Sequence, residues 1–498
     1  MAVLLRRLVW LLPVLTLLVG CAAERHTVQF DSATGEYAEL DRYALSRMQA
    51  VRIPGIAYAV VEPTGVAHTG VFGVDGDGDA VTASTPFLWG SVAKPVAATV
   101  VTSMAERGEV RLDAPVITYL PSFRLRDAAR SERITLRHLL AQTSGLPTST
   151  RYTDRPDAGR TPTSAVAELT EEDLVSEPGA EHHYSSTNYL VLAAVVEAVT
   201  GRSFIDVLTE RLLVPLGMDS AVIDANRASE VPKGHRFVFG RPVPFDAPVD
   251  PAGVAYGYLG GTLRDAAAFA SGALGGSTGV ISDDQRASMF RGETSTGTGR
   301  EYGLGWRLWS LPGTETPIVW HGGAAPGYFA QVILLPEQKR AVVLLANSYS
   351  PLHESRYLHT GFGLARLLAT GTPAPDDSAG RVYPAALTAL ALCLALLLAL
   401  NVRTLRLITR RPADGPLWRP IALGLARVLV AAGVLYGLGS MLPASQGTTL
   451  PQMVLWTPDL AWLVYGILLL TTTLLLARTV LAVRTVRGRT SLRTATRV

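Results

Sequence analysis

Cysteine and lysine are almost absent from this 498-residue sequence. Its two cysteines are Cys21 and Cys393, and Cys393 lies inside a long apolar run, so the region between them cannot build a disulfide framework. Lysine occurs only as Lys94, Lys233 and Lys339, although the chain has 45 basic residues in total. Because lysine is so rare here, a lysine that falls within a catalytic pattern is an improbable coincidence.

A basic surface is also lacking over most of the chain. The formal net charge of +3 comes from residues 381–498, which hold 13 arginines and two aspartates. The preceding residues hold 32 basic and 40 acidic side chains, so that part of the chain is mildly acidic. Binding to nucleic acid requires positive charge concentrated toward the phosphates, and it has no support in this distribution.

Long apolar runs occur only near the two ends. Three of them lie in the C-terminal part, and each has about the 20 residues that cross a hydrocarbon core of ~30 Å. They predict three transmembrane helices at residues 383–401, 420–442 and 459–480.

Arginines surround these runs unevenly. Five lie between the first and second runs and five follow the third, whereas residues 443–459 contain none. The positive-inside rule therefore places the basic tail at 481–498 in the cytoplasm and everything before the first run outside it. Arg427 and Arg478 lie inside the runs, and we expect both to extend to the cytoplasmic face.

The N-terminal run has the features of a secretion signal. Arg6 and Arg7 precede an apolar stretch, and Leu18-Val19-Gly20-Cys21 is similar to the lipobox of bacterial lipoproteins. This predicts a signal peptide at residues 1–20, with Cys21 as the lipidated residue that begins the mature chain. A plain signal peptide or anchor helix with an incidental cysteine is the alternative.

Residues 31–370 remain as one globular domain, followed by a linker at residues 371–382 that is rich in proline, glycine and aspartate. Apolar alternation predicts strands at both ends of this domain, and helical spacing predicts helices between them. This order indicates an α+β fold with an antiparallel sheet that the two ends of the domain close. The predicted strands lie at residues 55–61, 65–71, 318–320, 329–335 and 341–346, and the predicted helices at residues 37–50, 91–108, 136–142, 189–200 and 204–213.

Ser91 and Lys94 form the pattern with the clearest chemistry. Residues three apart at the start of a helix lie on one face, so the amine of Lys94 is predicted to lie beside the hydroxyl of Ser91. Burial lowers the pKa of a lysine, and the neutral amine can then accept the serine proton. We therefore expect Ser91 to be an acyl-accepting nucleophile. The alternative without a catalytic role is a helix cap followed by a surface lysine.

Two further elements complete the expected site. Tyr184 could relay protons if a nearby lysine lowers the pKa of its phenol. His321, Gly322 and Gly323 follow an apolar strand, where glycines allow a substrate backbone to approach closely. The backbone N–H groups of Ser91 and Ala324 could then form an oxyanion hole, and His321 could supply a polar or positive tip.

Three other patterns are weaker. Residues 275–279 match G-x-S-x-G but follow no apolar strand, so a loop is expected there. The aspartates at 75, 77 and 79 suggest a calcium loop, yet no glutamate closes a twelve-residue frame. His182 and His183 lack further ligands at suitable spacing. The sequence predicts no metal and no organic cofactor.

The order of these motifs resembles the serine β-lactamase and penicillin-binding superfamily, in its class C β-lactamase, D-alanyl-D-alanine carboxypeptidase and esterase branch. The likeness covers residues 37–367. It implies an antiparallel sheet of five or more strands flanked by helices, together with an all-helical lobe. It also implies Ser91 as nucleophile, Lys94 and Tyr184 as the proton-transfer pair, and His321-Gly322-Gly323 in place of Lys-Thr-Gly. The segments that carry the resemblance are Leu88-Trp89-Gly90-Ser91-Val92-Ala93-Lys94-Pro95, residues 134–147, Pro215-Leu216-Gly217-Met218, Tyr302-Gly303-Leu304-Gly305-Trp306 and residues 321–327.

Two departures from the superfamily pattern affect the expected substrate. Ser186 stands where many relatives carry the asparagine of Tyr-x-Asn, and His321 replaces a lysine. Both changes favour a peptidase or esterase over an efficient β-lactamase. The expected substrates are D-alanyl peptides, esters or β-lactams, hydrolysed outside a bacterial cell membrane. A catalytically weak receptor for cell-wall fragments that signals through the membrane is the alternative, and the oligomeric state stays open.

Overall fold

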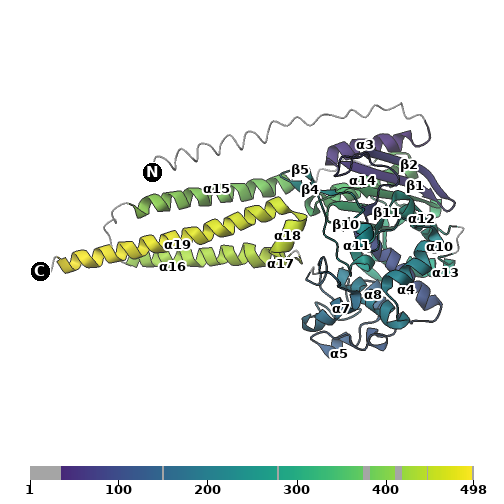
Figure 1. The fold of residues 1–498 in the computed structure, drawn as a ribbon, viewed down its shortest axis with the longest axis horizontal. Helices are drawn as coiled ribbons and strands as arrows, with labels where there is room; N and C mark the ends of the chain where they lie inside the picture. The colour runs from purple at the N-terminus through teal and green to yellow at the C-terminus, as the bar shows by residue number, and fades with distance from the viewer. Residues whose placement is uncertain are drawn as a thin grey trace.

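The computed structural model describes residues 35–148, 151–276, 280–373, 382–409, 418–445 and 447–495. The predicted signal peptide at 1–20 and the predicted lipidation site Cys21 lie outside these residues, as do most of the linker at 371–382 and part of the G-x-S-x-G segment. A globular domain is followed by a bundle of long helices that extends from one side of it (Figure 1).

An eight-stranded antiparallel sheet forms the centre of the globular domain, in the order β2-β1-β12-β11-β10-β9-β8-β7. The first and last parts of the domain meet in it, since Ile56 of β1 pairs with Ala346 of β12. This confirms the predicted α+β class and the sheet closed by both ends of the domain. The strands are β1 (Gly55–Glu62), β2 (Gly65–Gly73), β7 (Thr294–Gly297), β8 (Arg300–Tyr302), β9 (Arg307–Ser310), β10 (Pro317–Ala325), β11 (Tyr328–Leu335) and β12 (Arg340–Ala346).

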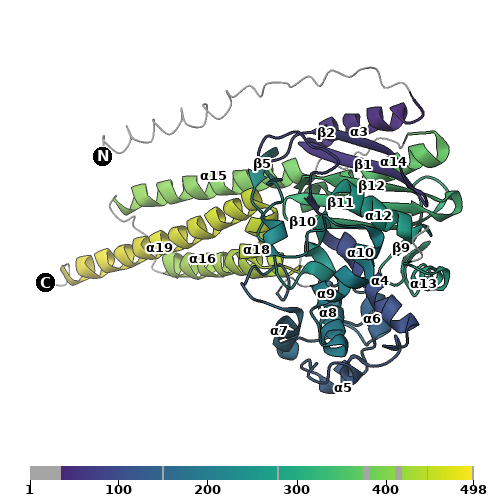
Figure 2. The ribbon, with the colours of Figure 1, turned by 45° about the vertical axis from the view of Figure 1, so that its right-hand side comes forward.

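Both faces of the central strands are covered, and alternate residues of each strand belong to different cores. In β1, Ile56 and Tyr58 pack with α3 (Ala38–Val51) and α14 (Glu354–Thr370). Ala57 and Ala59 point to the opposite face, where α12 (Leu263–Ala273) and the helical lobe lie. Figure 2 shows the helices on either side of the sheet. Because strand side chains alternate between faces, a strand that is covered on both sides reads as a continuous apolar run.

The helical lobe contains the most deeply buried helices of the domain. α4 (Ala93–Glu106) has 11 of its 14 residues buried, and α8 (Ser186–Thr200) begins three residues before its predicted start at Tyr189. The predicted helix at 91–108 is likewise confirmed, but residues Gly90–Val92 form a 3-10 turn that leads into it. The other helices of the domain are α5 (Ala128–Ser131), α6 (Leu136–Leu140), α7 (Pro162–Ala167), α9 (Phe204–Leu208), α10 (Val214–Leu216), α11 (Ala225–Ala228) and α13 (Asp283–Met289).

Two small sheets complete the globular domain. β3 (Phe87–Leu88) pairs with β6 (Gly260–Gly261), which fixes the chain just before the predicted nucleophile. A three-stranded sheet projects toward the helix bundle, and it consists of β13 (Ser348–Tyr349), β4 (Gly234–Val238) and β5 (Arg241–Phe245).

The C-terminal bundle contains three helices that are long and apolar enough to cross a membrane, at Val382–Ile408, Leu423–Ser445 and Pro458–Arg484. They confirm the three predicted apolar spans. α19 (Pro458–Ala495) continues through the predicted basic tail as one helix, and a short helix that the sequence did not predict, α18 (Leu450–Trp456), precedes it. The other helices of the bundle are α15 (Val382–Ile408), α16 (Trp418–Tyr436) and α17 (Leu442–Ser445).

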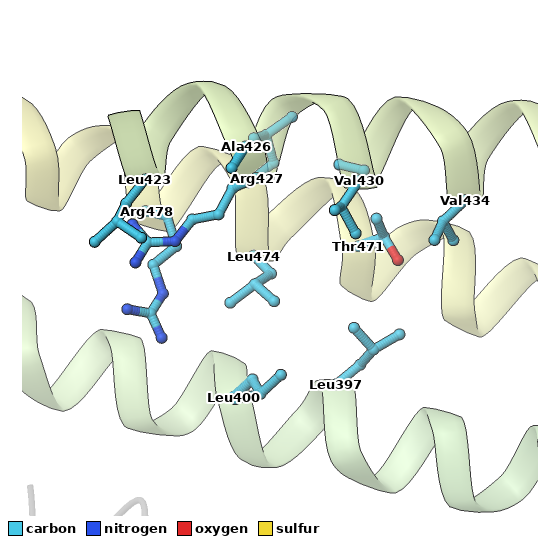
Figure 3. Close-up of a pocket in the computed structure, with 12 residues that line it drawn as sticks. Leu397, Leu400, Leu423, Ala426, Arg427, Val430, Val434, Thr471, Leu474 and Arg478 are labelled. Atoms are coloured by element: carbon cyan, nitrogen blue, oxygen red, sulfur yellow. The ribbon is translucent and has the colours of Figure 1, made fainter. Parts of the chain in front are cut away.

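An apolar cavity of about 430 Å³ lies between the three long helices. Leucines, valines and alanines form most of its lining, and Arg427 and Arg478 lie close together in it (Figure 3). The Arg427 side chain extends toward Leu423, which is nearer the start of α16. This direction is the one expected for an Arg427 side chain that extends to the predicted cytoplasmic face.

The bundle docks on the small three-stranded sheet through the buried carboxylate of Asp459. This carboxylate accepts hydrogen bonds from the backbone N–H of Phe239, at 2.8 Å, and from the phenol of Tyr383. The same phenol accepts a hydrogen bond from the N–H of Gly240 at 2.9 Å. The start of α19, the start of α15 and the β4–β5 turn are therefore held at one point.

Candidate active site

Ser91 lies in the 3-10 turn Gly90–Val92, directly before α4. Gly90 has φ +54°, and a Cβ atom there would lie 2.4 Å from the backbone N of Ala324. Only glycine fits this conformation and this space. The turn thus presents Ser91 beside the end of β10, as the proposed oxyanion hole requires.

Lys94 is completely buried in the first turn of α4. Its Nζ donates hydrogen bonds to Ser91 Oγ at 2.9 Å, to Ser186 Oγ at 3.1 Å and to the carbonyl oxygen of Tyr256 at 2.8 Å. The structure therefore brings together three residues that the sequence assigned to the site, and it adds Tyr256. None of the three acceptors is a carboxylate, so no negatively charged hydrogen-bond partner stabilises the protonated form of the amine.

The environment of Lys94 lowers its pKa to about 7. Burial is the main cause, because desolvation disfavours the charged amine. The Asp154 carboxyl group opposes this shift, and the Arg307 guanidinium adds to it. Near neutral pH a large fraction of Lys94 is unprotonated, and this form can accept a proton from Ser91.

Tyr184 lies against the same amine, with Lys94 Nζ 4.9 Å from the centre of its ring. The predicted lowering of its pKa is wrong: burial raises the pKa of Tyr184 to about 12, although Arg307 and a hydrogen bond with Ser91 oppose this shift. Desolvation of the phenolate outweighs the attraction of nearby positive charge. Tyr184 is therefore a protonated phenol at neutral pH, and it can donate a proton but not act as a resting base.

His321 lies near Tyr184, at 6.2 Å between ring centres, but it is completely buried. Its Nδ1 donates to the carbonyl oxygen of Gly322 at 2.7 Å, and its Nε2 accepts from the phenol of Tyr302 at 3.2 Å. Burial, Arg307 and Lys94 hold the pKa of His321 well below its usual range. The prediction that His321 carries a positive charge is therefore wrong, because the ring is neutral and both of its nitrogens form hydrogen bonds within the protein.

Arg307 supplies the positive charge that sequence reasoning assigned to His321. It lies in β9, and its guanidinium carbon is 5.1 Å from the ring centre of Tyr184 and 5.7 Å from that of Tyr302. The sequence holds one signal for it, since Arg307 directly follows the quoted segment Tyr302–Trp306. The sequence did not assign Arg307 to the site, because Arg307 is far from Ser91 along the chain.

A second group that the sequence missed, Asp154, lines the same cavity as Ser91. Asp154 accepts a hydrogen bond from the phenol of Tyr258 at 3.0 Å, and its backbone N–H donates to the phenol of Tyr256 at 3.0 Å. Burial raises the pKa of Asp154 to about 6. Asp154 lies in a loop without a recognisable motif, so no pattern in the sequence marked it.

Gln142 positions the segment that carries Tyr184 and Ser186. Its Oε1 accepts hydrogen bonds from the backbone N–H of Ser185 at 2.8 Å and from Asn188 Nδ2 at 2.5 Å. Gln142 belongs to the segment 134–147 quoted for the resemblance. Its buried amide oxygen thus fixes the start of α8, where Ser186 meets Lys94.

The end of β10 borders the site, but its residues face different ways. A Cβ on Gly323 would lie 2.6 Å from the backbone N of Ser91, whereas one on Gly322 would meet Leu358 of α14 at 3.1 Å. Gly322 therefore faces the opposite side of the sheet from Ser91. Neither glycine is among the residues that line the cavity at Ser91, whereas Ala324 is.

On the side of β9, the last part of β10 has no strand partner among the described residues. β9 pairs with β10 only as far as Trp320, opposite Arg307, within the described strands. β11 continues to pair with residues 321–325 on the other side. A substrate backbone can add to such an edge as a further strand, as the glycine pattern predicted.

The weaker sequence patterns have structural explanations. Asp75 Oδ1 accepts hydrogen bonds from the N–H groups of Asp77 and Asp79, at 3.0 Å each, which closes a turn. His182 packs against Tyr302, with 5.4 Å between ring centres. No group of three or more His, Cys, Asp or Glu side chains suited to a metal occurs among the described residues.

An eight-stranded antiparallel sheet, a helical lobe and a Ser-x-x-Lys pair at their junction define a class of proteins that are mostly serine hydrolases. The sequence matches the β-lactamase family over residues 40–362, so the chain belongs to this family. The C-terminal bundle lies outside the matched region.

Three relatives illustrate the similarity. The chain is 31% identical over 314 residues to Penicillin-binding protein 4 of Amycolatopsis lactamdurans, a match that covers 59% of this chain and 81% of that protein. It is 26% identical over 340 residues to Unguisins hydrolase ungD' of Aspergillus campestris, covering 64% and 62% of the two chains. It is 23% identical over 318 residues to Protein flp of Staphylococcus aureus, covering 62% of each. The matches thus span about three fifths of the last two relatives.

Two solved structures share the fold. The octameric penicillin-binding protein homologue from Pyrococcus abyssi has a TM-score of 0.59 and 23% identity, and the match covers 67% of this chain and 78% of that chain. A class C β-lactamase mutant has a TM-score of 0.57 and 20% identity, covering 67% and 98% respectively.

The pH dependence of Ser91 acylation tests the role of Lys94. Since Lys94 accepts a proton only when unprotonated, labelling by a fluorophosphonate should rise about tenfold per pH unit below pH 7 and level off above it. Label incorporation from pH 5 to 9 measures this. The variant Lys94→Met should label ~10²–10⁴-fold more slowly. A rate without a midpoint near neutral pH in the wild type would contradict this role.

The charge of Arg307 should shift that profile. Arg307 lowers the pKa of Lys94, so Arg307→Gln should raise this pKa and move the midpoint of the labelling profile to higher pH. His321→Asn is the matched control, because a neutral ring exerts no comparable field, and its midpoint should stay at the wild-type value. Equal shifts in both variants would show that packing, not charge, controls the pKa.

Proposed function

We propose that this protein is a serine hydrolase that acts outside the cytoplasm and forms an acyl-enzyme on Ser91 with amides or esters. The observation that carries the proposal is the buried amine of Lys94, which lies 2.9 Å from Ser91 Oγ and has a pKa lowered to about 7. A base that titrates near the working pH is efficient in proton transfer. Membership of the β-lactamase family supports the same chemistry.

In the acylation step, unprotonated Lys94 takes the proton of Ser91 while Oγ attacks the carbonyl carbon of the substrate. The electron pair of the carbonyl bond moves to its oxygen. In this proposal the backbone N–H groups of Ser91 and Ala324 donate to this oxyanion, and both residues line the cavity. A tetrahedral intermediate results, with the proton held on Lys94.

When the intermediate collapses, the bond to the leaving amine or alkoxide breaks and that group needs a proton. Tyr184 can donate its phenolic proton and recover one from Lys94, whose Nζ lies 4.9 Å from the Tyr184 ring centre. Water then attacks the ester on Ser91 and gives its proton to Lys94. That proton returns to Ser91 Oγ as the acid product leaves, which restores the enzyme.

Ser186 bears on the choice of substrate. Its hydroxyl accepts a hydrogen bond from Lys94 at 3.1 Å, whereas an asparagine at this position would also offer amide donors to a substrate. This difference supports a D-alanyl peptidase or an esterase over an efficient β-lactamase. The relatives include both a penicillin-binding protein and a protein named a hydrolase.

The proposed membrane orientation rests on the arginine distribution, together with one contact that relates the catalytic domain to the spans. The arginine distribution favours a cytoplasmic first connection and tail. In addition, Trp456, in the connection between the second and third spans, lines the same cavity as Ser91. The contact puts the catalytic domain on the same side as that connection, and the arginine distribution favours the extracytoplasmic side for it.

A receptor that signals through the membrane is the second candidate. The buried Asp459 carboxylate binds both the β4–β5 turn, at Phe239, and the start of α15, at Tyr383. Ligand-dependent movement of the globular domain would be transmitted to the spans through this point. Acylation without turnover would favour this candidate over the hydrolase.

Mass spectrometry of the intact protein tests the covalent step. After incubation with a fluorophosphonate or a penicillin, the wild type should gain the mass of one acyl or phosphonyl group, and Ser91→Ala should gain none. Turnover of D-Ala-D-Ala peptides, p-nitrophenyl esters and nitrocefin then distinguishes the substrates. Absence of an adduct with both reagents would overturn the hydrolase proposal.

A reporter fused after Val498 tests the orientation. A reporter that functions only in the cytoplasm should be active there, because arginines follow the third span. The matched control is the same reporter inserted at residues 447–449, between the second span and α18, where it should be inactive. A reporter that is inactive after Val498 but active at the inserted position would place the catalytic domain on the cytoplasmic side.

A further inference from the structure

One wall of the cavity at Ser91 comes from the membrane region. The cavity has a volume of about 110 Å³, and its lining includes Ser91, Ser186 and Ala324 together with Trp456, the last residue of α18. The family match ends at residue 362, so Trp456 lies far outside it. A residue from the connection between two candidate spans therefore belongs to the predicted catalytic cavity.

The connection at residues 447–457, which we call the strap, contacts both lobes of the globular domain. A Cβ on Gly447 would lie 2.2 Å from the carbonyl oxygen of Thr148, whose hydroxyl donates to the carbonyl oxygen of Tyr184 at 2.5 Å. At its other end, the ring of Trp456 packs edge-on against Tyr349, with 5.7 Å between ring centres. The strap thus runs from the helical lobe to the sheet side of the site.

Several contacts hold the strap in place. Thr449 and Gln452 form a capping box at the start of α18, and Arg236 of β4 donates to the carbonyl oxygen of Val454 at 3.2 Å. Three residues after Trp456, the buried Asp459 binds the β4–β5 turn. Trp456 is therefore fixed from both sides.

The strap also sets the distance between the cavity and the membrane. The third candidate span begins at Pro458, two residues after Trp456, and two residues of chain reach at most ~7 Å. Figures 1 and 2 both show α18 at the end of the bundle, against the globular domain. Tryptophan is also a side chain that favours the membrane–water interface. The cavity therefore lies within a short length of chain of the third candidate span.

We infer that the substrate of Ser91 is an amide or ester carried by a lipid in the bilayer, and that Trp456 contacts the part between the scissile carbonyl and the lipid. This inference rests on the proposed function and specifies its substrate class. A cavity of about 110 Å³ is smaller than the ~300–1,000 Å³ typical of pockets for drug-sized ligands. Only the part of the substrate that contains the scissile carbonyl fits in the cavity, and the rest of the substrate extends along the strap and the membrane surface. The bonds formed and broken are those of the acyl-enzyme cycle, without another reactant.

The test uses the full-length protein in nanodiscs, which expose both faces of the bilayer, and one fluorogenic ester in three forms. The ester is free in solution, attached directly to the headgroup of phosphatidylethanolamine, or attached to it through a long polyethylene glycol spacer. The directly attached ester should be hydrolysed at least as fast as the long-spacer form. A site tens of ångströms above the bilayer could not reach it, and this comparison does not depend on how strongly the lipid forms partition into the membrane.

Variants at position 456 test the contact with tryptophan. Trp456→Ala should lower kcat/KM for the directly attached ester about tenfold more than kcat/KM for the free ester, a typical effect of losing one apolar contact. Trp456→Phe, which keeps an aromatic ring against Tyr349, should retain most of the preference. Trp462→Ala is the matched control, because Trp462 lies exposed on the third span and does not line the cavity, and it should match the wild type.

The outcomes separate this inference from the proposed function. Hydrolysis of the free and long-spacer esters without hydrolysis of the directly attached ester would overturn the lipid substrate and leave the hydrolase intact. An unchanged ratio of kcat/KM values in Trp456→Ala would overturn the role of Trp456. Failure of Ser91 to label, with no hydrolysis of any form, would instead overturn the proposed function.

Discussion

The site depends on the burial of one amine whose hydrogen-bond partners carry no charge. Lys94 is fully buried and binds two hydroxyl oxygens and one carbonyl oxygen. A carboxylate in contact would hold the proton on the amine, whereas neutral acceptors leave desolvation as the dominant effect. The Asp154 carboxyl group acts on Lys94, but its own pKa is raised to about 6, and Arg307 opposes it. The balance places the pKa of Lys94 near neutrality.

The packing of the two lobes creates this burial. α4 lies between the sheet and the other helices, with Ala93, Lys94 and Pro95 all buried. Close approach of β10 to the Ser91 turn requires glycine at Gly90 and at Gly323, where any Cβ would collide with backbone atoms. The same approach aligns Ala324 with Ser91. The proposed nucleophile, base and oxyanion hole are thus consequences of one contact between the lobes.

The membrane region does more than anchor the globular domain. Its docking is polar and specific, since the buried carboxylate of Asp459 joins the starts of two candidate spans to the β4–β5 turn. A flexible tether would leave the catalytic cavity free to face any direction. The observed docking instead orients it and brings Trp456 to its edge. The globular domain has the fold of its family, whereas the docked bundle determines the direction from which a substrate can approach.

Local patterns in the sequence determined a large part of this protein. The spacing of Ser91 and Lys94, the apolar strands and the three apolar spans all follow from neighbours in the chain, and the structure contains them. The sequence did not predict β7, β8 and β9, and it ended β10 at Trp320, whereas β10 continues to Ala325. Tertiary structure decided what depends on burial and on contacts between distant segments. It raised the pKa of Tyr184, because desolvation there outweighs nearby positive charge, and it made His321 neutral, because burial and the charges of Arg307 and Lys94 all lower the pKa of that ring. The sequence does not state the depth of burial. Tertiary structure also brought Asp154 and Trp456 to the cavity at Ser91 and Arg307 to Tyr184, because only the packing of sheet, helical lobe and bundle makes these segments neighbours.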